Sequence, residues 1–256
     1  VVRALLGAGA DPKKASKIGM TALMKACANG NGRCARALIE AGVDVNATEE
    51  DDCTALMFAC QNGHDACARA LLEAKADPQQ IDFNKGETAL MRSAQHGHDA
   101  CARALLEAGA AADTRNYDGT TALVFAASNG HERCARVLLE AGAAVDRKMY
   151  NGDTALTLSC QNGHRPCCVV LLEANADANV SRRDGRTGLM AAAQQGHDAC
   201  ARVLLEAGAD LEKLKINGTT ALILSAQKGH ARVARTLLDA GAVVDATDHK
   251  GATALM

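Results

Sequence analysis

Cysteine and histidine are the residues of this chain whose types and spacing first suggest chemistry. The sequence holds 11 cysteines and 8 histidines. Six cysteines occupy equivalent positions (Cys34, Cys67, Cys101, Cys134, Cys167 and Cys200), and six histidines follow a glycine, from Gly63-His64 to Gly229-His230. Thiols can form disulfides, bind metals or act as nucleophiles, and imidazoles can act as general acids or bases. Each of these roles needs a second residue of a particular type nearby, and the spacing of the residues along the sequence indicates whether one is present.

The regular recurrence of the cysteines favours packing over chemistry. Val233 replaces the cysteine in the last repeat, and valine is typical of a buried apolar position. Packed helices lie roughly 8–10 Å apart, beyond the roughly 7 Å Cα separation that a disulfide tolerates. Pairs within one repeat, such as Cys27 with Cys34 or Cys60 with Cys67, can approach more closely. No Cys-x-x-Cys pair or suitably spaced histidine predicts a zinc site, so we expect reduced core cysteines, no metal and no cofactor.

The Gly-His histidines recur too evenly for a catalytic site. A catalytic centre would make one repeat differ from the others, with a nucleophile and an orienting acid nearby. The sequence contains no Ser-His-Asp constellation, paired-carboxylate motif or phosphate-binding glycine loop. We therefore predict histidines that bond the adjacent loop and pack on the neighbouring repeat, and no enzymatic activity. A redox role would need reactive thiols beyond edge residues such as Cys53.

Composition limits the kind of core that can form. The 256 residues are 48% hydrophobic but only 2% aromatic, which predicts thin repeated helical layers of Ala, Leu, Val, Met and Cys. The net charge of −2 provides no drive toward nucleic acid or an anionic membrane. No apolar run is long enough to span a bilayer. We expect a cytoplasmic or otherwise intracellular protein that neither binds nucleic acid nor inserts into membranes.

A Thr-x-Leu motif organises the whole chain. It recurs every 33 residues, with one step of 34. In one repeat, residues 86–113, Thr88 is placed to cap a helix that runs to about His96 and that Gly97 can end. A second amphipathic helix and a polar, hairpin-like loop follow. A fixed period of this length indicates stacked units, each of which buries its apolar face against its neighbours.

At these residues the chain resembles the ankyrin repeat family. The family pattern of Thr-Pro-Leu-His, Gly-His, a Leu-Leu helix and Gly-Ala-Asp is matched throughout, although Ala usually replaces Pro and Met often replaces His. The resemblance implies an all-α solenoid of stacked ankyrin repeats, with a helix-turn-helix and a hairpin-like loop in each repeat. An adaptable Met layer should replace the family's Thr-to-His bond. Seven complete repeats and a partial repeat at each end predict a single ankyrin repeat domain over residues 1–256, part of a longer protein.

The resemblance also implies where a partner would bind. In ankyrin proteins the first helix of each repeat faces a concave groove, so its variable residues are candidates for contact. These groove positions lie four, seven and eight residues after each motif threonine. They include three large side chains and two amides that we predict to bind a partner: Phe58, Arg92, Phe125, Gln61 and Gln95. The alternative for the two Phe is that they only cover the seam between helices.

Loop tips form the second candidate surface. Tyr117 and Tyr150 share one tip position and are expected to stand side by side, with rings suited to contact. The charge of the loop tips changes from acidic at residues 49–52 to basic in later repeats, at Arg147, Lys148, Arg182, Arg183 and Arg186. Of these basic residues, Arg183 is the one that we predict to bind a partner. Such a gradient can orient an elongated partner. The predicted function is a non-catalytic protein–protein interaction scaffold. The alternative is an architectural spacer or engineered repeat scaffold with no specific partner.

A row of arginines on the second helices has a simpler explanation. Six repeats carry one at equivalent positions: Arg36, Arg69, Arg103, Arg136, Arg202 and Arg235. Each precedes a Glu or Asp by four residues, a spacing that places the two charges on one helix face. The pattern predicts a solvated face of ion pairs within each helix and does not indicate a phosphate-binding track.

Overall fold

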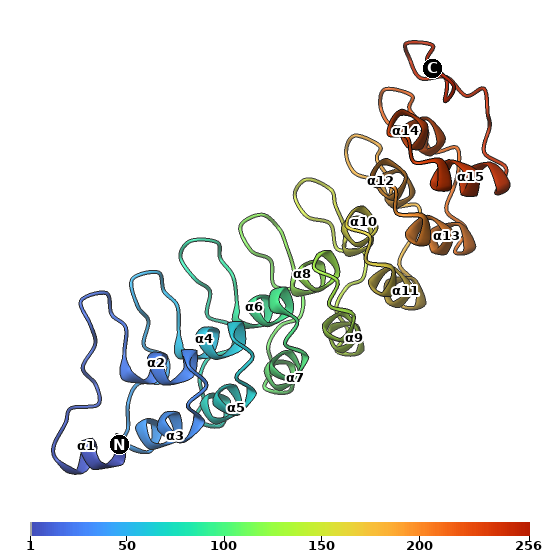
Figure 1. The fold of residues 1–256 in the computed structure, drawn as a ribbon. Helices are drawn as coiled ribbons and strands as arrows, with labels where there is room; N and C mark the ends of the chain where they lie inside the picture. Colours follow the sequence, from blue (N-terminus) through green and yellow to red (C-terminus); the bar gives the residue numbers. More distant parts are fainter. Residues whose placement is uncertain (1) are drawn as a thin grey trace. The chain divides into compact units, whose positions relative to one another are not determined.

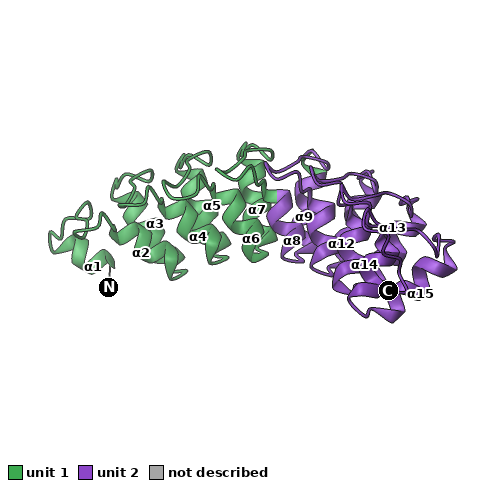
Figure 2. Cartoon of the chain, turned by 90° about the horizontal axis from the view of Figure 1, so that it is seen from above, with its two compact units in different colours: residues 1–122, 140–143 green, residues 123–139, 144–256 purple. Residues whose placement is uncertain are grey.

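The computed structural model describes residues 2–256, and α-helices form almost all of its regular structure (Figure 1). Fifteen helices and no strand occur in this described part, although isolated antiparallel bridges such as Ala15 with Thr21 close some loop bases. Two compact units make up the chain (Figure 2). Unit 1 comprises residues 1–122 and 140–143, and unit 2 comprises residues 123–139 and 144–256. The single domain expected from the sequence stays a prediction.

Unit 1 is built from successive helix pairs. Its helices are α1 (Val2–Gly7), α2 (Ala22–Ala28), α3 (Gly32–Glu40), α4 (Ala55–Gln61), α5 (Asp65–Glu73), α6 (Ala89–His96) and α7 (Asp99–Glu107). Helices α2, α4 and α6 pack in sequence as one layer, and α3, α5 and α7 pack as a second layer. The loops between pairs project on the side of α2, α4 and α6 (Figure 1).

Unit 2 repeats the same arrangement. Its helices are α8 (Ala122–Ser128), α9 (Glu132–Glu140), α10 (Ala155–Gln161), α11 (Arg165–Glu173), α12 (Gly188–Gln195), α13 (Asp198–Glu206), α14 (Ala221–Gln227) and α15 (Ala231–Asp239). Helices α10, α12 and α14 pack in one layer, and α11, α13 and α15 pack in the other. The predicted all-α solenoid, with a helix pair and a hairpin-like loop in each repeat, is confirmed.

Threonine caps and a layer of buried side chains define each first helix. Thr88 Oγ1 accepts a hydrogen bond from the Met91 N–H at 3.3 Å, and α6 ends at Gly97, whose φ is +77°. Equivalent caps are made by Thr21, Thr54, Thr154, Thr187 and Thr220. The methionine that follows each cap by three residues is buried where present: Met24, Met57, Met91 and Met190. The predicted helix bounds and the Met layer are both found.

Candidate functional site

The Gly-His histidines join successive repeats. His64 Nε2 donates to the Ala28 carbonyl at 3.2 Å, and His98 Nε2 donates to the Gln61 carbonyl at 3.1 Å. In unit 2, His230 makes the same bond to the preceding first helix. Each imidazole also covers a glycine of the preceding repeat, so closely that a Cβ on Gly30 would lie 2.7 Å from His64 Nδ1. The predicted structural role of these histidines is confirmed.

The thiols are core residues, but their contacts differ from those expected. All 11 cysteines are free, and Cys34 is the one that is half-buried. Cys27 contacts Cys67 of the next repeat, and Cys60 contacts Cys101, because first helices face the following pair. Within one repeat, Cys160 Sγ lies 3.4 Å from Cys168 Sγ. Burial raises the pKa of Cys167 to about 12, which suppresses the reactive thiolate.

Cys53 was expected at an edge, and the structure corrects this expectation. The residue is buried, and burial raises the pKa of its thiol to about 11. Its sulfur accepts a hydrogen bond from Arg92 Nη2 at 3.1 Å. The edge position belongs instead to Cys34 of α3, which α1 covers incompletely because α1 has 6 residues.

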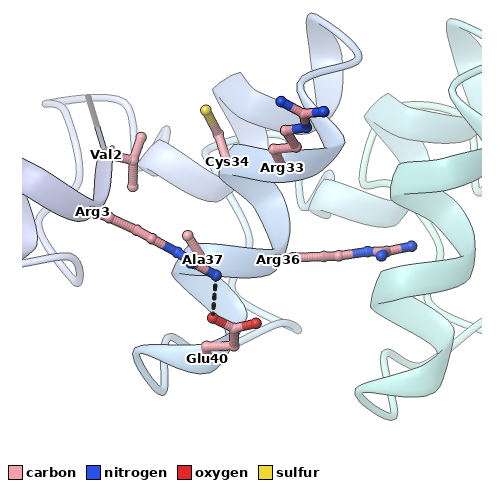
Figure 3. A pocket seen from close by; sticks show the side chains of 7 residues that line it. All are labelled: Val2, Arg3, Arg33, Cys34, Arg36, Ala37 and Glu40. Carbon is pink, nitrogen blue, oxygen red and sulfur yellow. Dashed lines mark hydrogen bonds and ion pairs between the residues drawn. The ribbon is translucent and has the colours of Figure 1, made fainter.

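Figure 3 shows a shallow cleft beside Cys34, between α1 and α3. Arg3 reaches across it, and its Nη2 lies 3.1 Å from Glu40 Oε2. The other lining residues include Val2, Arg33 and Arg36. No nucleophile with a base, and no convergent set of acceptors, occurs among these residues. The cleft therefore reflects the incomplete covering of α3 by α1.

The arginine row pairs between repeats, where pairing within each helix was expected. Arg69 lies 3.7 Å from Glu107, and Arg103 lies 3.8 Å from Glu140, each in the following repeat. In unit 2, Arg136 reaches both Glu132 of its own helix and Glu173 of the next repeat. These side chains are about half exposed, and such pairs contribute little, typically about 0–1 kcal/mol. The row is a solvated face, as predicted, although its partners differ.

The predicted groove residues vary widely in exposure. Lys25 is exposed, Phe58, Phe125 and Leu158 are half-buried, and Ala191 is buried. Phe125 also shows how the helix ends are held, because its carbonyl accepts a hydrogen bond from Asn129 Nδ2 at 2.9 Å. The two Phe thus cover their helices and keep part of each ring accessible. Their half-buried state is compatible with both hypotheses, that the rings only cover the seam between helices and that they contact a partner.

Arg92 is tied into the fold by a network that the sequence pattern did not indicate. Its Nη1 donates to Gln61 Oε1 at 2.9 Å, and its Nη2 donates to Asp82 Oδ2 at 3.1 Å. The side chains of Arg92 and Asp82 are 13% and 2% exposed. Burial raises the pKa of Asp82, but hydrogen bonds from the Lys85 amide and Arg92 outweigh it and hold the pKa below its usual value. The ion pair fastens the loop to α6.

A polar pocket of about 340 Å³ lies over this network. It brings the predicted residues Gln61, Arg92 and Gln95 together with loop residues that belong to no repeat motif. The complete lining is Gln61, Asp82, Asn84, Lys85, Glu87, Arg92, Gln95 and His96. All eight of these side chains carry hydrogen-bonding groups, so the pocket suits a polar or charged group. The one-residue insertion between Asp77 and Gly86 lies in the loop that supplies half of the lining.

The loop tips carry exposed rings, and one of them was missed. Phe83 and Tyr117 are 68% and 58% exposed in unit 1, and Tyr150 is 55% exposed in unit 2. Tip backbones bond in register, with the Tyr117 N–H donating to the Lys85 carbonyl and the Phe83 N–H to the Asp51 carbonyl, both at 2.9 Å. Counting forward from Asp77, instead of back from Thr88, would have placed Phe83 at the tip. The expected proximity of Tyr117 and Tyr150 stays a prediction.

The Tyr117 ring is positioned by a glycine. A Cβ on Gly86, whose φ is +70°, would lie 2.6 Å from Tyr117 Cε1, so the ring rests on this backbone. A glycine satisfies both the left-handed conformation and the close approach. Tyr117 is therefore exposed on one face and supported on the other, which reduces the conformational entropy lost on contact.

The charged tips differ in how far they are neutralised. In unit 1, Glu50, Asp51 and Asp52 are exposed, and Asp52 takes the left-handed φ of +58° where other loops have glycine. In unit 2, Arg183 is exposed, whereas Arg182 lies 3.4 Å from Asp153.

Arg186 in unit 2 is a half-buried cation, and two of its side-chain nitrogens are buried without acceptors. Its Nε and Nη2 are buried and have no hydrogen-bond partner. Burial, and then the charge of Arg182, lower the pKa of Arg186. The carboxylate nearest in sequence, Asp184, instead accepts a hydrogen bond from the Arg186 backbone N–H at 3.1 Å.

The family assignment follows from the sequence matches. The model described as Ankyrin repeats (3 copies) matches residues 1–82, 79–149 and 142–215, and the model described as Ankyrin repeat matches residues 217–249. The chain belongs to the ankyrin repeat family. Ankyrin repeats generally mediate protein–protein interaction, and ankyrin repeat proteins are typically non-enzymatic scaffolds.

Solved structures agree with this assignment. The human ASB11 ankyrin repeat domain, a crystal structure, is similar to the chain with a TM-score of 0.79 and 31% sequence identity. The match covers 87% of this chain and 99% of that domain. A search of curated proteins gives no match. Within residues 2–256, none of the helices combines the length and apolar character needed to cross a bilayer.

Proposed function

We propose that this ankyrin repeat chain binds a partner protein through its loop tips and the groove positions of its first helices. The exposed rings at equivalent tips carry the proposal, because Phe83, Tyr117 and Tyr150 are large, rigid and mostly accessible. The scaffold does not bury these rings in its core. Arg183 adds an exposed cation at the tip position that follows Tyr150.

The groove positions contribute in two ways under this proposal. Phe58 and Phe125 offer partly accessible rings, and Gln95 lines the polar pocket. Arg92 and Gln61 act indirectly, because their mutual hydrogen bond shapes the polar pocket. Under this proposal Phe58 and Phe125 contact the partner, whereas Arg92 and Gln61 hold the contact surface in place.

A double substitution tests the tip surface. Tyr117→Ala with Tyr150→Ala should reduce partner capture at least about tenfold in an affinity pull-down quantified by mass spectrometry, because exposed tyrosines are frequent energetic centres of interfaces. The melting temperature should change little, since both rings are more than half exposed. A matched control is Arg69→Ala with Arg103→Ala, two half-exposed side chains on the second-helix face.

The outcomes separate the possible functions. Undiminished capture by the tyrosine variant, with the same proteins retained, would remove the tips from the proposal. Retention of nothing specific by the unaltered chain would contradict partner binding and favour the architectural spacer or engineered scaffold. Equal losses in the tyrosine and arginine variants would indicate nonspecific adsorption.

A further inference from the structure

Glu87 is a largely buried residue whose carboxylate opens only on the polar pocket and is left without a partner by the fold. It directly precedes Thr88, the N-cap of α6, and the residue is 5% exposed. Its backbone N–H donates to Asp82 Oδ2 at 3.2 Å. Among residues 2–256, however, no hydrogen bond or ion pair is made by its own carboxylate, which lines the polar pocket. A buried ionised carboxylate is unfavourable unless a donor or a cation compensates it.

The surrounding charges do not provide that compensation. The charged or titratable groups facing Glu87 come from its own loop, from α6 and from the next loop: Asp82, Lys85, Arg92, His96 and Asp118. Arg92 is already paired with Asp82, and Lys85 is exposed to solvent. The carboxylates of Glu87, Asp82 and Asp118 together outnumber the two cations, Lys85 and Arg92. Burial raises the pKa of Glu87, and the charge of Lys85 offsets this only in part.

The loop that carries Glu87 is joined to an acidic tip. The Phe83 N–H donates to the Asp51 carbonyl at 2.9 Å, so this loop lies beside the exposed acids of the preceding repeat. Glu50, Asp51 and Asp52 all belong to that tip and are exposed. An approaching basic segment would meet favourable potential before it reaches the pocket.

We propose that the Glu87 pocket receives a lysine or arginine side chain of the partner protein. This inference rests on the proposed function and adds the chemistry of the contact. The cationic group donates to the Glu87 carboxylate, and the side-chain oxygen of Asn84, which also lines the pocket, accepts a further N–H group. The Arg92–Asp82 pair forms the fixed floor and does not compete for Glu87.

Protonation provides a signature of this contact. A cation beside Glu87 favours the ionised carboxylate and lowers its pKa relative to the free protein. Complex formation therefore releases a proton when the pH lies between the pKa values of the bound and free forms. A neutral donor or an apolar side chain in the pocket would not produce this release.

The test selects binders from a displayed library of random short peptides. The unaltered protein should enrich sequences with Lys or Arg at one fixed position by at least about tenfold, and Glu87→Gln should reduce that preference to about twofold or less. Glu50→Gln is the matched control, because it removes an equal charge from the neighbouring exposed tip and should keep the positional preference. Unchanged melting of both variants shows that the fold is retained.

Calorimetry on one selected peptide completes the test. Titrations in two buffers with different ionisation enthalpies should show proton release by the unaltered protein and none by Glu87→Gln. Selection of peptides without a fixed basic position, or the same basic preference in Glu87→Gln, would overturn the pocket inference while leaving peptide binding intact. Failure to select any peptide would contradict the proposed function itself, and the inference with it.

Discussion

Glu87 in unit 1 and Arg186 in unit 2 hold the same repeat position, directly before the N-cap threonine of a first helix, but carry opposite charges. Neither side chain makes a hydrogen bond or an ion pair within residues 2–256. Thr120 and Thr219 fill this position in other repeats and are similarly buried. The fold therefore needs no charge at this position, and both charges oppose folding.

Two other buried charges are fully supported by their surroundings. Asp153 holds the same position in another repeat of unit 2, yet it accepts hydrogen bonds from Thr157 Oγ1 at 3.2 Å and Asn151 Nδ2 at 2.9 Å and lies 3.4 Å from Arg182. Asp82 is supported by Arg92, of which only Nε lacks an acceptor. A charge with its partners built in belongs to the scaffold. A charge without them is open to a ligand.

Removing a supported charge should have the largest effect. Asp82→Asn leaves the largely buried Arg92 without its counterion and should lower the free energy of unfolding by about 3 kcal/mol, measured by urea denaturation. Because the folded pKa of Asp82 is lowered, its contribution is present above the unfolded pKa and is lost as pH falls through the folded pKa. The variant should lack this acid dependence, and a stability equal to that of the unaltered chain would contradict the assigned role of the pair.

Removing the unsupported cation should have the opposite sign. Arg186→Thr, which installs the residue found at positions 120 and 219, should raise the free energy of unfolding by about 1 kcal/mol, because it removes two buried nitrogens that lack acceptors. Thermal and urea unfolding should both report the gain. A comparable loss of stability would show that Arg186 has favourable contacts in solution and would break the comparison with Glu87.

Neutralising Glu87 should give the smallest and most pH-dependent change. Its folded pKa is raised, so its favourable contribution is complete below the unfolded pKa and is lost as pH rises through the folded pKa. Glu87→Gln mimics the protonated state and should therefore exceed the unaltered chain by up to about 1 kcal/mol at neutral pH and by nothing in acid. A stability difference that is constant between acid and neutral pH would contradict the assigned burial of this carboxylate.

Regular features of the chain could be predicted from sequence, and local exceptions could not. The helix ends at Thr88 and Gly97 were predictable because a threonine hydroxyl caps a helix start and a glycine accepts the left-handed conformation at its end. The structural role of His64 was predictable because the Gly-His pair recurs in successive repeats. Arg92 was expected to contact a partner because helix spacing predicts only the face on which its side chain lies. Its ion pair with Asp82 could not be predicted, because Asp82 belongs to an irregular loop. The one-residue insertion between Asp77 and Gly86 also shifts the register of this loop, so the position of Phe83 at the tip was not predicted.

The cysteine contacts could not be predicted because they depend on how neighbouring repeats are offset. Cys27 contacts Cys67, because the first helix faces the second helix of the following repeat. Sequence spacing sets the period of the stack but not this offset. Glu87 was overlooked for a related reason: a single carboxylate has no motif, and only burial without a partner distinguishes it.

The contact between a glycine of one repeat and a histidine of the next bears on how the number of repeats can change. Gly63 receives His98 in the same way that Gly163 receives His197, so the two halves of the joint are interchangeable from one repeat to another. A whole repeat can then be gained or lost with a glycine still facing a histidine at the new boundary. A substitution of Gly63, by contrast, would strain its own left-handed backbone and clash with His98 of the following repeat. Duplication and deletion in whole repeats are thereby easier for this sequence to accommodate than a single side chain at the joint.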